Sequence, residues 1–312
     1  MTSKKNMIKK YYFSSVASIL CIVIIVLTFI FDNELKKAII GGMDLAALRI
    51  IPTLFPFMII SDYWISNVKI NENGIVGVLF EKILKINKSM ISAFLTGVFA
   101  GFPLGVKSAV DVYSCGAVTR DELERIAPII NLPSLAFVIS GVGLGLYNDI
   151  KIGFLLYFSV LVASLIVGFV QGRNKEYSHF TSVISRQSFN LTDSIKKAGL
   201  SSITISSYII FFSGVIGLTS AILKKSTLLA FVASFLEVGN ATVIISESDL
   251  FYKNLSLILT AFALGFSGFS VHLQAFSFLP KEISKYRYIK TKLIIGLLSS
   301  ILMTIDTFIL KI

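Results

Sequence analysis

Residues 101–107 read Gly-Phe-Pro-Leu-Gly-Val-Lys and lie in the middle of an apolar segment that spans residues 89–113. Proline lacks a backbone donor and glycine favours turns, so this segment is not expected to form one continuous helix. We predict two half-helices joined at residues 101–105. Irregular backbone at membrane depth is tolerated only where protein or a water-filled cavity satisfies its polar groups, so the break predicts a re-entrant hairpin beside a cavity.

The composition indicates that lipid surrounds this segment. The chain has 312 residues, of which 54% are hydrophobic and only 15% are charged, whereas about a quarter of the residues in a soluble domain are charged. Residues 14–31, 152–170 and 293–310 are each apolar and reach roughly the 20 residues that a helix needs to cross a bilayer. The first run lacks a signal-peptide cleavage site, so we expect it to stay as a helix. The sequence therefore predicts an all-α polytopic membrane protein.

The basic residues indicate the topology. The formal net charge is +11, but the basic side chains form short clusters between apolar runs, which is not the pattern of a nucleic-acid-binding face. Such clusters collect on the cytoplasmic side of a membrane, so we expect a bacterial inner-membrane protein with a cytoplasmic N-terminus. The clusters are Lys4, Lys5, Lys9 and Lys10; Arg173, Lys175, Arg186, Lys196 and Lys197; and Lys281, Lys285, Arg287, Lys290 and Lys292.

A second broken segment resolves a conflict in this topology. If every apolar stretch crossed the membrane, residues 172–194 would lie outside, against the charge rule. Residues 226–247 are interrupted by Glu-Val-Gly-Asn at 237–240, and a second re-entrant hairpin there returns every basic cluster to the cytoplasm. About seven membrane spans then remain, at residues 12–31, 38–65, 128–148, 151–171, 195–222, 251–280 and 289–310.

The order of these elements predicts an inverted repeat within a single membrane domain, residues 1–312. Two spans, a hairpin and a broken span occupy residues 12–148, the same order recurs from the opposite side in residues 151–280, and residues 289–310 form a final span. Corresponding breaks in two inverted halves are typical of secondary transporters. The alternative is a chance alignment of generic membrane helices. Residues 74–86 are too short and too charged to cross, and they predict an interfacial helix.

The first hairpin contributes Gly101, Pro103 and Gly105 as candidate substrate-binding residues. The second half-helix would begin with free N–H groups and about half a positive charge, which suits an anion. Lys107 adds a full positive charge one turn farther on and is a candidate for the same role. The alternative is that Lys107 reaches the cytoplasmic face and pairs with Asp111.

Asn131 and Ser134 are candidate substrate ligands at the start of the span at residues 128–148. Pro128 and Pro133 disfavour a continuous helix there, which would turn both polar side chains toward the first hairpin. A plain capping role is the alternative, because Asn and Ser are preferred helix N-caps.

The second hairpin contributes Glu237 and Asn240. A carboxylate at this depth must pair, take up a proton or bind a cation, so Glu237 is a candidate coupling site for H⁺ or Na⁺, and Asn240 is a candidate substrate ligand. The alternative for Glu237 is an internal ion pair with Lys107 or Arg49. We expect Arg49 to be buried, where it would either counter an anionic substrate or tie its span to Glu237.

A third break lies at residues 265–274, Gly-Phe-Ser-Gly-Phe-Ser-Val-His-Leu-Gln, within the span at residues 251–280. Its candidate substrate ligands are Ser267, Ser270 and Gln274. The imidazole of His272 could relay protons, and a satisfied interhelical hydrogen bond is the alternative.

The sequence contains no pattern typical of an enzyme or a cofactor site. Cys21 and Cys115 have neither CxxC nor zinc spacing, and we expect both to be packing residues. We find no Ser-His-Asp arrangement, metal-ligand cluster or phosphate loop, so we expect no cofactor, no metal ion and no catalytic activity.

These motifs resemble those of the sporulation integral membrane proteins of the YlbJ type, within the larger group that carries the nucleoside-recognition Gate domain. The resemblance covers roughly residues 38–280 and is carried by residues 101–107 with 111–113, by residues 119–125 and by residues 265–274. It implies a transporter built from paired hairpins. The sporulation branch is implicated in moving dipicolinic acid across a membrane that surrounds the forespore, whereas wider Gate proteins resemble nucleoside carriers.

Three functions compete. The first is a secondary transporter of a small organic anion, with export of dipicolinate from the mother cell as the first candidate, because Lys107, Arg49 and a half-helix N-terminus would attract carboxylates. The second is a nucleoside-type carrier, because Asn, Gln, Glu and Ser side chains could bind a ribose and a base. The third is a non-transporting membrane assembly protein. The expected partners are the small-molecule substrate, membrane lipid and a coupling H⁺ or Na⁺, with no nucleic acid, and homo-oligomerisation stays open.

The topology makes a prediction about accessibility. Cysteines introduced into residues 172–194 or 281–292 should react with a membrane-impermeant thiol reagent only from the cytoplasmic side, because both segments carry basic clusters. Labelling of either segment from outside intact cells would contradict the inverted repeat.

Overall fold

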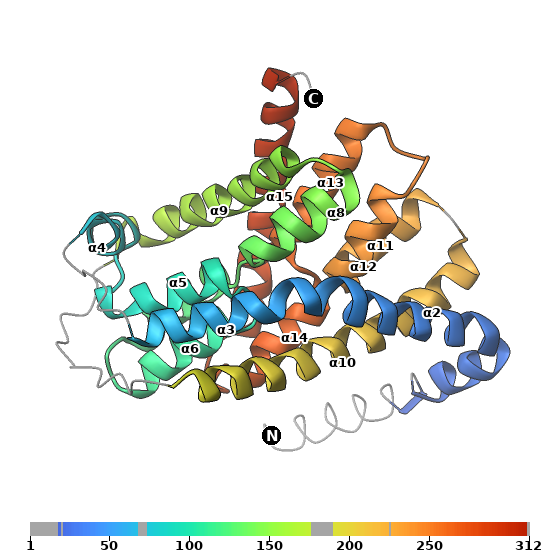
Figure 1. Ribbon diagram of the computed structural model, residues 1–312. Helices are drawn as coiled ribbons and strands as arrows, with labels where there is room; N and C mark the ends of the chain where they lie inside the picture. Colours follow the sequence, from blue (N-terminus) through green and yellow to red (C-terminus); the bar gives the residue numbers. More distant parts are fainter. Residues whose placement is uncertain (1–17, 20, 68–73, 176–189, 225, 311–312) are drawn as a thin grey trace, which may run out of the picture.

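The computed structural model describes residues 18–19, 21–67, 74–175, 190–224 and 226–310, and all regular secondary structure in these ranges is helical (Figure 1). The labels η1, η2 and η4 denote π-helical stretches, and η3 is a 3-10 turn. The elements are α2 (Asp32–Asp44), η1 (Leu45–Ile50), α3 (Ile51–Asn67), α4 (Ile75–Val78), η2 (Leu79–Leu84), η3 (Lys88–Met90), α5 (Ile91–Phe99), α6 (Leu104–Ser114), α7 (Arg120–Ile130), η4 (Phe137–Leu144), α8 (Gly145–Tyr147), α9 (Ile150–Gly172), α10 (Leu191–Leu223), α11 (Thr227–Leu236), α12 (Val238–Ser246), α13 (Lys253–Phe266), α14 (Gly268–Phe278) and α15 (Lys285–Leu310).

Five helical segments among the described residues are long and apolar enough to cross a membrane. They are Asp32–Trp64, Ile150–Gly172, Leu191–Leu223, Lys253–Phe278 and Lys285–Ile309. These segments coincide with five of the expected spans, and α2, η1 and α3 join into the first of them. Figure 1 shows this first segment lying alongside α10, with which it packs. The chain is therefore a multi-pass helical membrane protein, as predicted.

Both segments expected to form hairpins are broken. Residues 100–103 separate α5 from α6, and Glu237 alone, with an extended backbone, separates α11 from α12. In each pair the two short helices pack against each other. Neither segment is an unbroken crossing helix, whereas their depth in a membrane stays a prediction.

Two expected spans are also broken where the sequence predicts. Residues 131–134 have no helical structure and separate α7 from the segment that begins at residue 135, whereas Pro128 is accommodated inside α7. Ser267 separates α13 from α14 and adopts a left-handed backbone conformation, with φ of 75°. The described residues thus contain these four breaks, two between short paired helices and two within longer segments.

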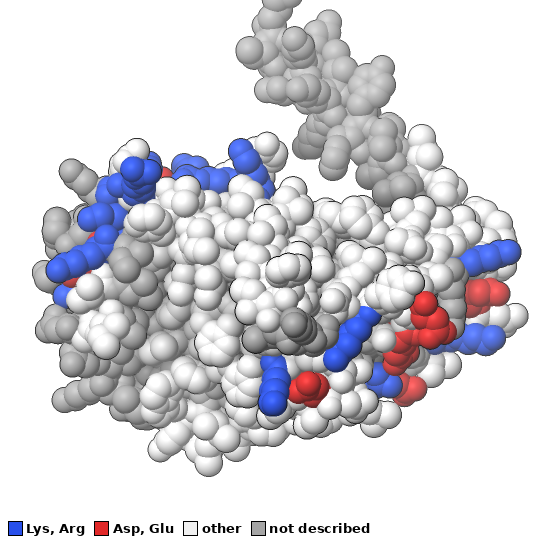
Figure 2. Space-filling view, turned by 90° about the horizontal axis from the view of Figure 1, so that it is seen from above, with Lys and Arg blue, Asp and Glu red and all other residues white. Residues whose placement is uncertain are grey.

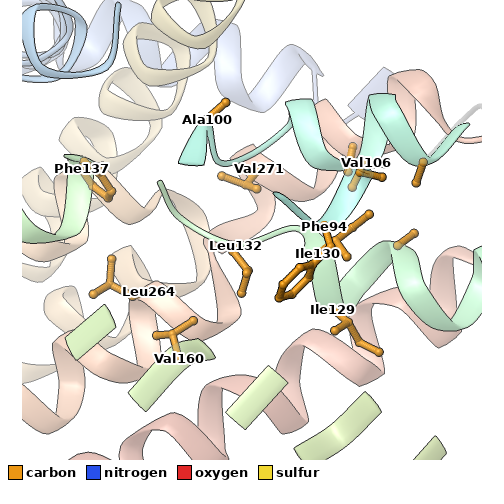
Figure 3. Close-up of a cluster of buried hydrophobic side chains, with 14 of the residues drawn as sticks. Phe94, Ala100, Val106, Ile129, Ile130, Leu132, Phe137, Val160, Leu264 and Val271 are labelled. Carbon is orange, nitrogen blue, oxygen red and sulfur yellow. The ribbon is translucent and has the colours of Figure 1, made fainter. Parts of the chain in front are cut away.

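The interior of the molecule is apolar around these breaks. Buried side chains from α5, α6, α7, α9, α13 and α14 form one cluster, and Figure 3 labels Ile129, Ile130, Leu132 and Leu264 among them. Leu132 lies on the irregular segment after α7 and is completely buried. Burial of a leucine of this kind contributes roughly 1.5–3 kcal/mol, so the cluster holds the irregular backbone in place.

Charged side chains lie mainly at the two ends of the long helices. In Figure 2, Lys and Arg gather at the left end of the face shown, a second group that mixes Lys or Arg with Asp or Glu extends from the lower middle to the right, and the rest of this face is largely uncharged. Many large apolar side chains are exposed on the long helices, among them Leu48, Phe211 and Phe308. An apolar belt between charged ends is the surface that a bilayer requires.

Several predictions about individual residues are wrong. Residues 281–292 are expected to form a loop, but α15 begins at Lys285, and Lys292 is fully buried on one face of this helix while Lys285 and Lys290 are exposed. Cys21 and Cys115 are expected to pack inside, but both are exposed. Cys21 lies on an apolar helix whose neighbouring side chains are also exposed, and Cys115 lies just beyond the end of α6.

The segment at residues 74–86 is helical, as α4 and η2, and its interfacial position stays a prediction. Arg125 ties its end to α7 by donating hydrogen bonds to the carbonyl oxygens of Leu84 (3.1 Å) and Lys85 (2.9 Å). The N-terminal lysines at residues 4, 5, 9 and 10, residues 12–17 and 20 of the span expected at 12–31, and Arg186 lie outside the described residues.

The N-terminus of α7 anchors the start of α15. Thr119 and Glu122 form a capping box that begins α7, as expected for a Thr-x-x-Glu sequence. In the same first turn, Asp121 pairs with Arg125 (3.0 Å), Arg287 (3.4 Å) and Lys175 (3.5 Å). Burial raises the pKa of Asp121, but these three cations outweigh it and hold the pKa below its ordinary value.

This pairing predicts a pH dependence of stability. A carboxyl group whose pKa is lower in the folded state stabilises the fold above its unfolded pKa, of about 3.9, and loses that contribution as the pH falls through the folded value. Asp121→Asn should therefore lower the melting temperature at neutral pH, and the difference from wild type should shrink below about pH 4. The control is Asp32→Asn, which removes one exposed pair with Lys36 and should change the melting temperature far less. A pH-independent difference would contradict this account.

Candidate functional site

The breaks meet in pairs, one pair in each half of the chain. A Cβ atom at Gly101 would lie 2.5 Å from the backbone nitrogen of Ser134, so the break between α5 and α6 packs directly on residues 131–134. A Cβ atom at Gly268 would lie 3.0 Å from the backbone nitrogen of Glu237 and 3.0 Å from the carbonyl oxygen of Leu236. The break between α11 and α12 therefore packs on the break between α13 and α14.

A small cavity lies between the two pairs, and we call it the central cavity. Its volume is about 20 Å³, which is enough for roughly one water molecule. Figure 3 labels three of its lining residues, Ala100, Phe137 and Val271, each from a different segment. The full lining is Ile50, Leu54, Ala100, Phe102, Ser134, Phe137, Ile205, Ile209, Glu237, Val238, Gly239, Val271 and Gln274. Of the predicted site residues, the structure thus brings Ser134, Glu237 and Gln274 together.

The first break presents a helix N-terminus to this region. Pro103 occupies the N-cap position of α6 and provides no side-chain hydrogen bond. The backbone N–H groups of Leu104 and Gly105 both donate to the carbonyl oxygen of Gly101, at 3.0 and 3.4 Å, so the prediction that these groups are free is wrong. The positive end of the α6 dipole is nevertheless not neutralised by a capping carboxylate.

Gly105 has a packing contact that the sequence does not reveal. A Cβ atom there would lie 2.7 Å from the carbonyl oxygen of Ile130 and 2.8 Å from the Cα atom of Gly97. Gly105 thus allows α6 to approach α5 and the end of α7, and it does not line the central cavity.

The break between α11 and α12 places the carboxylate of Glu237 at the central cavity. Glu237 is 2% exposed. Its carboxylate oxygens accept hydrogen bonds from the backbone N–H of Gly239 (2.9 Å), the backbone N–H of Asn240 (2.6 Å) and Nδ2 of Asn240 (2.8 Å). The carboxylate therefore caps the N-terminus of α12, where a negative charge is favourable.

The predicted ion pair between Glu237 and Arg49 or Lys107 is not present. Arg49 lies in η1, has an exposed side chain and pairs with Glu247 at 3.7 Å. Lys107 places Nζ 5.9 Å from the centroid of the Phe278 ring, at the end of α14. Neither cation lines the central cavity.

On α14, the polar residues His272 and Gln274 face different sides of the helix. Gln274 faces the central cavity, its Nε2 lies 3.4 Å from Oγ of Ser270, and its Oε1 has no hydrogen-bond partner among the described residues. His272 faces away, with Nε2 2.8 Å from the carbonyl oxygen of Phe266 and its ring edge-on to Tyr288. Ser267 donates to the carbonyl oxygen of Leu264 at 3.0 Å and so belongs to the end of α13.

Asn131 belongs to a buried polar cluster behind the central cavity that sequence reasoning missed. Lys292 is completely buried, and its Nζ donates to the carbonyl oxygen of Asn131 at 3.0 Å. Nδ2 of Asn131 donates to the hydroxyl of Tyr288 at 2.6 Å. Asn131 ends α7, and a cation is favourable at a helix C-terminus, so Lys292 ties α15 to the break. The sequence offers one signal for the burial of Lys292, because it lies four residues after Tyr288 and so on the same helix face. The neighbouring basic residues instead favour an exposed loop.

The described residues contain no group of three or more His, Cys, Asp or Glu side chains placed to hold a metal ion. What the central cavity does offer is one carboxylate, one amide and one hydroxyl within an apolar wall. This set suits hydrogen bonding to a small polar ligand or binding of a cation.

Comparison with known proteins identifies a similar membrane protein. The chain is 23% identical over 284 residues to the sporulation integral membrane protein YlbJ of Bacillus subtilis (strain 168), a match that covers 76% of this chain and 69% of that protein. The chain resembles the YlbJ-type proteins. The predicted resemblance to the YlbJ-type proteins is thereby confirmed, whereas the wider Gate group stays a prediction. No protein-family model matches the chain, and no solved structure matches it.

The contact between the second pair of breaks predicts an effect of substitution at Gly268. Gly268→Ala adds a left-handed backbone cost of about 1–2 kcal/mol and also pushes on Leu236 and Glu237. Gly116 has the same φ of 73°, but no atom lies within 4 Å of the position that its Cβ atom would occupy, so Gly116→Ala is the matched control. We expect Gly268→Ala to lower the melting temperature clearly more than Gly116→Ala. Equal effects would show that the breaks do not support each other.

Proposed function

We propose that this protein is a secondary transporter of a small organic anion and that the central cavity is its substrate site. The observation that carries this proposal is the meeting of two broken helix pairs at one cavity. Transporters commonly bind substrates between discontinuous helices, where helix termini and unpaired polar groups are available without lipid contact.

The proposed topology is the one that the charges favour. It has seven spans, two re-entrant hairpins, a cytoplasmic N-terminus and an inverted repeat in residues 12–148 and 151–280, in the inner membrane of a bacterium. Both halves contain a short-helix pair whose break packs on the break of a longer segment. This shared arrangement supports the repeat, because it recurs at corresponding positions of the two halves.

Dipicolinate is our first candidate for the substrate. The relative's name assigns it to sporulation, and the α6 N-terminus beside the cavity has no capping carboxylate to compete with a substrate carboxylate. Phe102 and Phe137, both in the cavity wall, have ring centroids 6.5 Å apart and would contact an aromatic ring. Ligand pockets usually enclose at least about 300 Å³, so the cavity must expand when the substrate enters.

A nucleoside is the second candidate. No residue that lines the central cavity is basic, and its polar groups are Ser134, Glu237 and Gln274. Such groups bind hydroxyls and base edges at least as well as carboxylates. A transporter of nucleosides would use the same cavity and the same proposed topology.

Uptake by purified protein in proteoliposomes tests the function. We expect uptake of labelled dipicolinate in an ion gradient, exceeding that of labelled uridine. Gln274→Leu should reduce the apparent affinity by about tenfold, which corresponds to roughly 1.4 kcal/mol, because it removes the amide Nε2, the donor on Gln274 that could bind a substrate carboxylate. The control is Gln171→Leu, which alters a glutamine that bonds Thr291 outside the cavity and should leave uptake unchanged. Preference for uridine would favour the nucleoside carrier, and uptake of neither compound would favour an assembly role.

A further inference from the structure

A second and much larger cavity, which we call the vestibule, lies beside the central one. Its volume is about 720 Å³, and it is formed by α2, η1, α10, α11, α12 and the residues that follow α12. Its lining is Ala38, Gly41, Asp44, Leu45, Arg49, Ser213, Ile216, Gly217, Ser220, Ser226, Leu229, Asn240, Val243, Ile244, Glu247, Ser248, Asp249 and Leu250. In the proposed topology these segment ends lie on the outer side of the membrane.

The charged groups of the vestibule are mostly acidic. Its lining includes the carboxylates of Asp44, Glu247 and Asp249 and one guanidinium, that of Arg49, which pairs with Glu247. A cavity lined by one sign of charge concentrates ions of the opposite sign. The vestibule is therefore suited to attract cations and to repel organic anions.

One hydrogen-bonded layer separates the vestibule from the central cavity. Ser213 and Asn240 line the vestibule, and Nδ2 of Asn240 donates to Oγ of Ser213 (2.8 Å) and to Oε2 of Glu237 (2.8 Å). On the other side of this layer, Glu237 lines the central cavity. A rotation of the Asn240 side chain would break both hydrogen bonds and expose the carboxylate to the vestibule.

The central cavity contains a second oxygen placed for a cation. Oε1 of Gln274 is buried, has no hydrogen-bond partner among the described residues, and belongs to the same cavity wall as Glu237. Among the described residues that line this cavity, Glu237 alone is titratable. His272 faces the Tyr288 ring instead, and the charged groups on the vestibule side are Asp44, Arg49, Glu247 and Asp249.

We infer that the vestibule is the route by which a small monovalent cation, H⁺ or Na⁺, reaches Glu237 and Gln274 from the outer side, with Asn240 as the gate. Binding at these oxygens would supply the coupling ion of the proposed transporter. This use of the ion rests on the proposed function, and the assignment of the outer side rests on the proposed topology. An organic anion would reach the central cavity from the opposite, cytoplasmic side.

The charge preference of the vestibule can be measured with thiol reagents. Ser220→Cys, made after Cys21→Ser and Cys115→Ser, places a reporter in the vestibule, and a second protein that retains Cys115 provides a reference outside it. The ratio of the reaction rates with cationic and with anionic methanethiosulfonates should be at least about threefold higher at position 220 than at position 115. High salt should reduce this difference.

Neutralising the vestibule provides the control. Asp44→Asn with Asp249→Asn should lower the ratio at position 220 toward the reference. Asp149→Asn changes a carboxylate that does not line the vestibule and keeps a residue able to cap α9, so it should leave the ratio unchanged. Equal ratios at the two reporter positions, or a preference that survives neutralisation, would overturn the cation route.

Melting temperatures of the purified protein test cation binding at Glu237. One series compares Na⁺ with choline at fixed pH, and a second series varies the pH in choline. We expect a response to Na⁺ or to pH that is lost in Glu237→Gln, which keeps an acceptor oxygen for the N–H groups of α12. If that variant does not fold, Gln274→Leu should weaken the Na⁺ response, and an unchanged response would count against the site. A melting temperature with no Glu237-dependent response to either ion overturns the inference. Neither test measures uptake, so each result is independent of the proposed substrate.

Discussion

The backbone polar groups at each broken helix must be satisfied away from bulk water, and this requirement places the breaks against one another. A single break in an apolar segment would expose unpaired N–H and C=O groups, each of which costs several kcal/mol in hydrocarbon. Here Gly101 lies on Ser134 and Gly268 lies on Glu237 and Leu236. In both contacts a glycine with positive φ allows backbone to approach backbone without an intervening side chain. The central cavity is the space left between these two contacts.

The N–H groups at the start of α6 and at the start of α12 are satisfied in different ways. This difference determines which charge each side of the central cavity favours. Glu237 caps α12 through three hydrogen bonds, so the positive end of that helix is already matched by a carboxylate. α6 begins after Pro103 without a side-chain cap, and the carbonyl oxygen of Gly101 takes its first N–H groups. One side of the cavity therefore favours negative charge and the other favours a cation, which is the arrangement that a coupled transporter of an anion would need.

Interactions between the helix ends restrain the elements around this cavity. Asp121 and Glu124 on α7 both pair with Arg287 on α15, and Lys292 on α15 bonds the carbonyl oxygen at the end of α7. Contacts with α15 thus restrain the break at residues 131–134. The side chain of Asn240 is held by two hydrogen bonds, to Ser213 and to Glu237. The proposed cation route requires the vestibule side to open. Opening there would separate Asn240 from Glu237 without disturbing the ion pairs of α7.

Local features of the sequence specify the class of the protein, the five long apolar segments and the positions of the breaks, because hydrophobic length, proline and glycine act locally. They also mark Ser134, Glu237 and Gln274 as polar residues in apolar surroundings. Which of the candidates share a cavity is set by the tertiary structure alone. Arg49 faces Glu247, Lys107 lies by Phe278 and Lys292 is buried, since the direction of a side chain depends on helix rotation and on π-helical stretches such as η1. The vestibule likewise arises from segments more than 150 residues apart, whose packing no local pattern specifies.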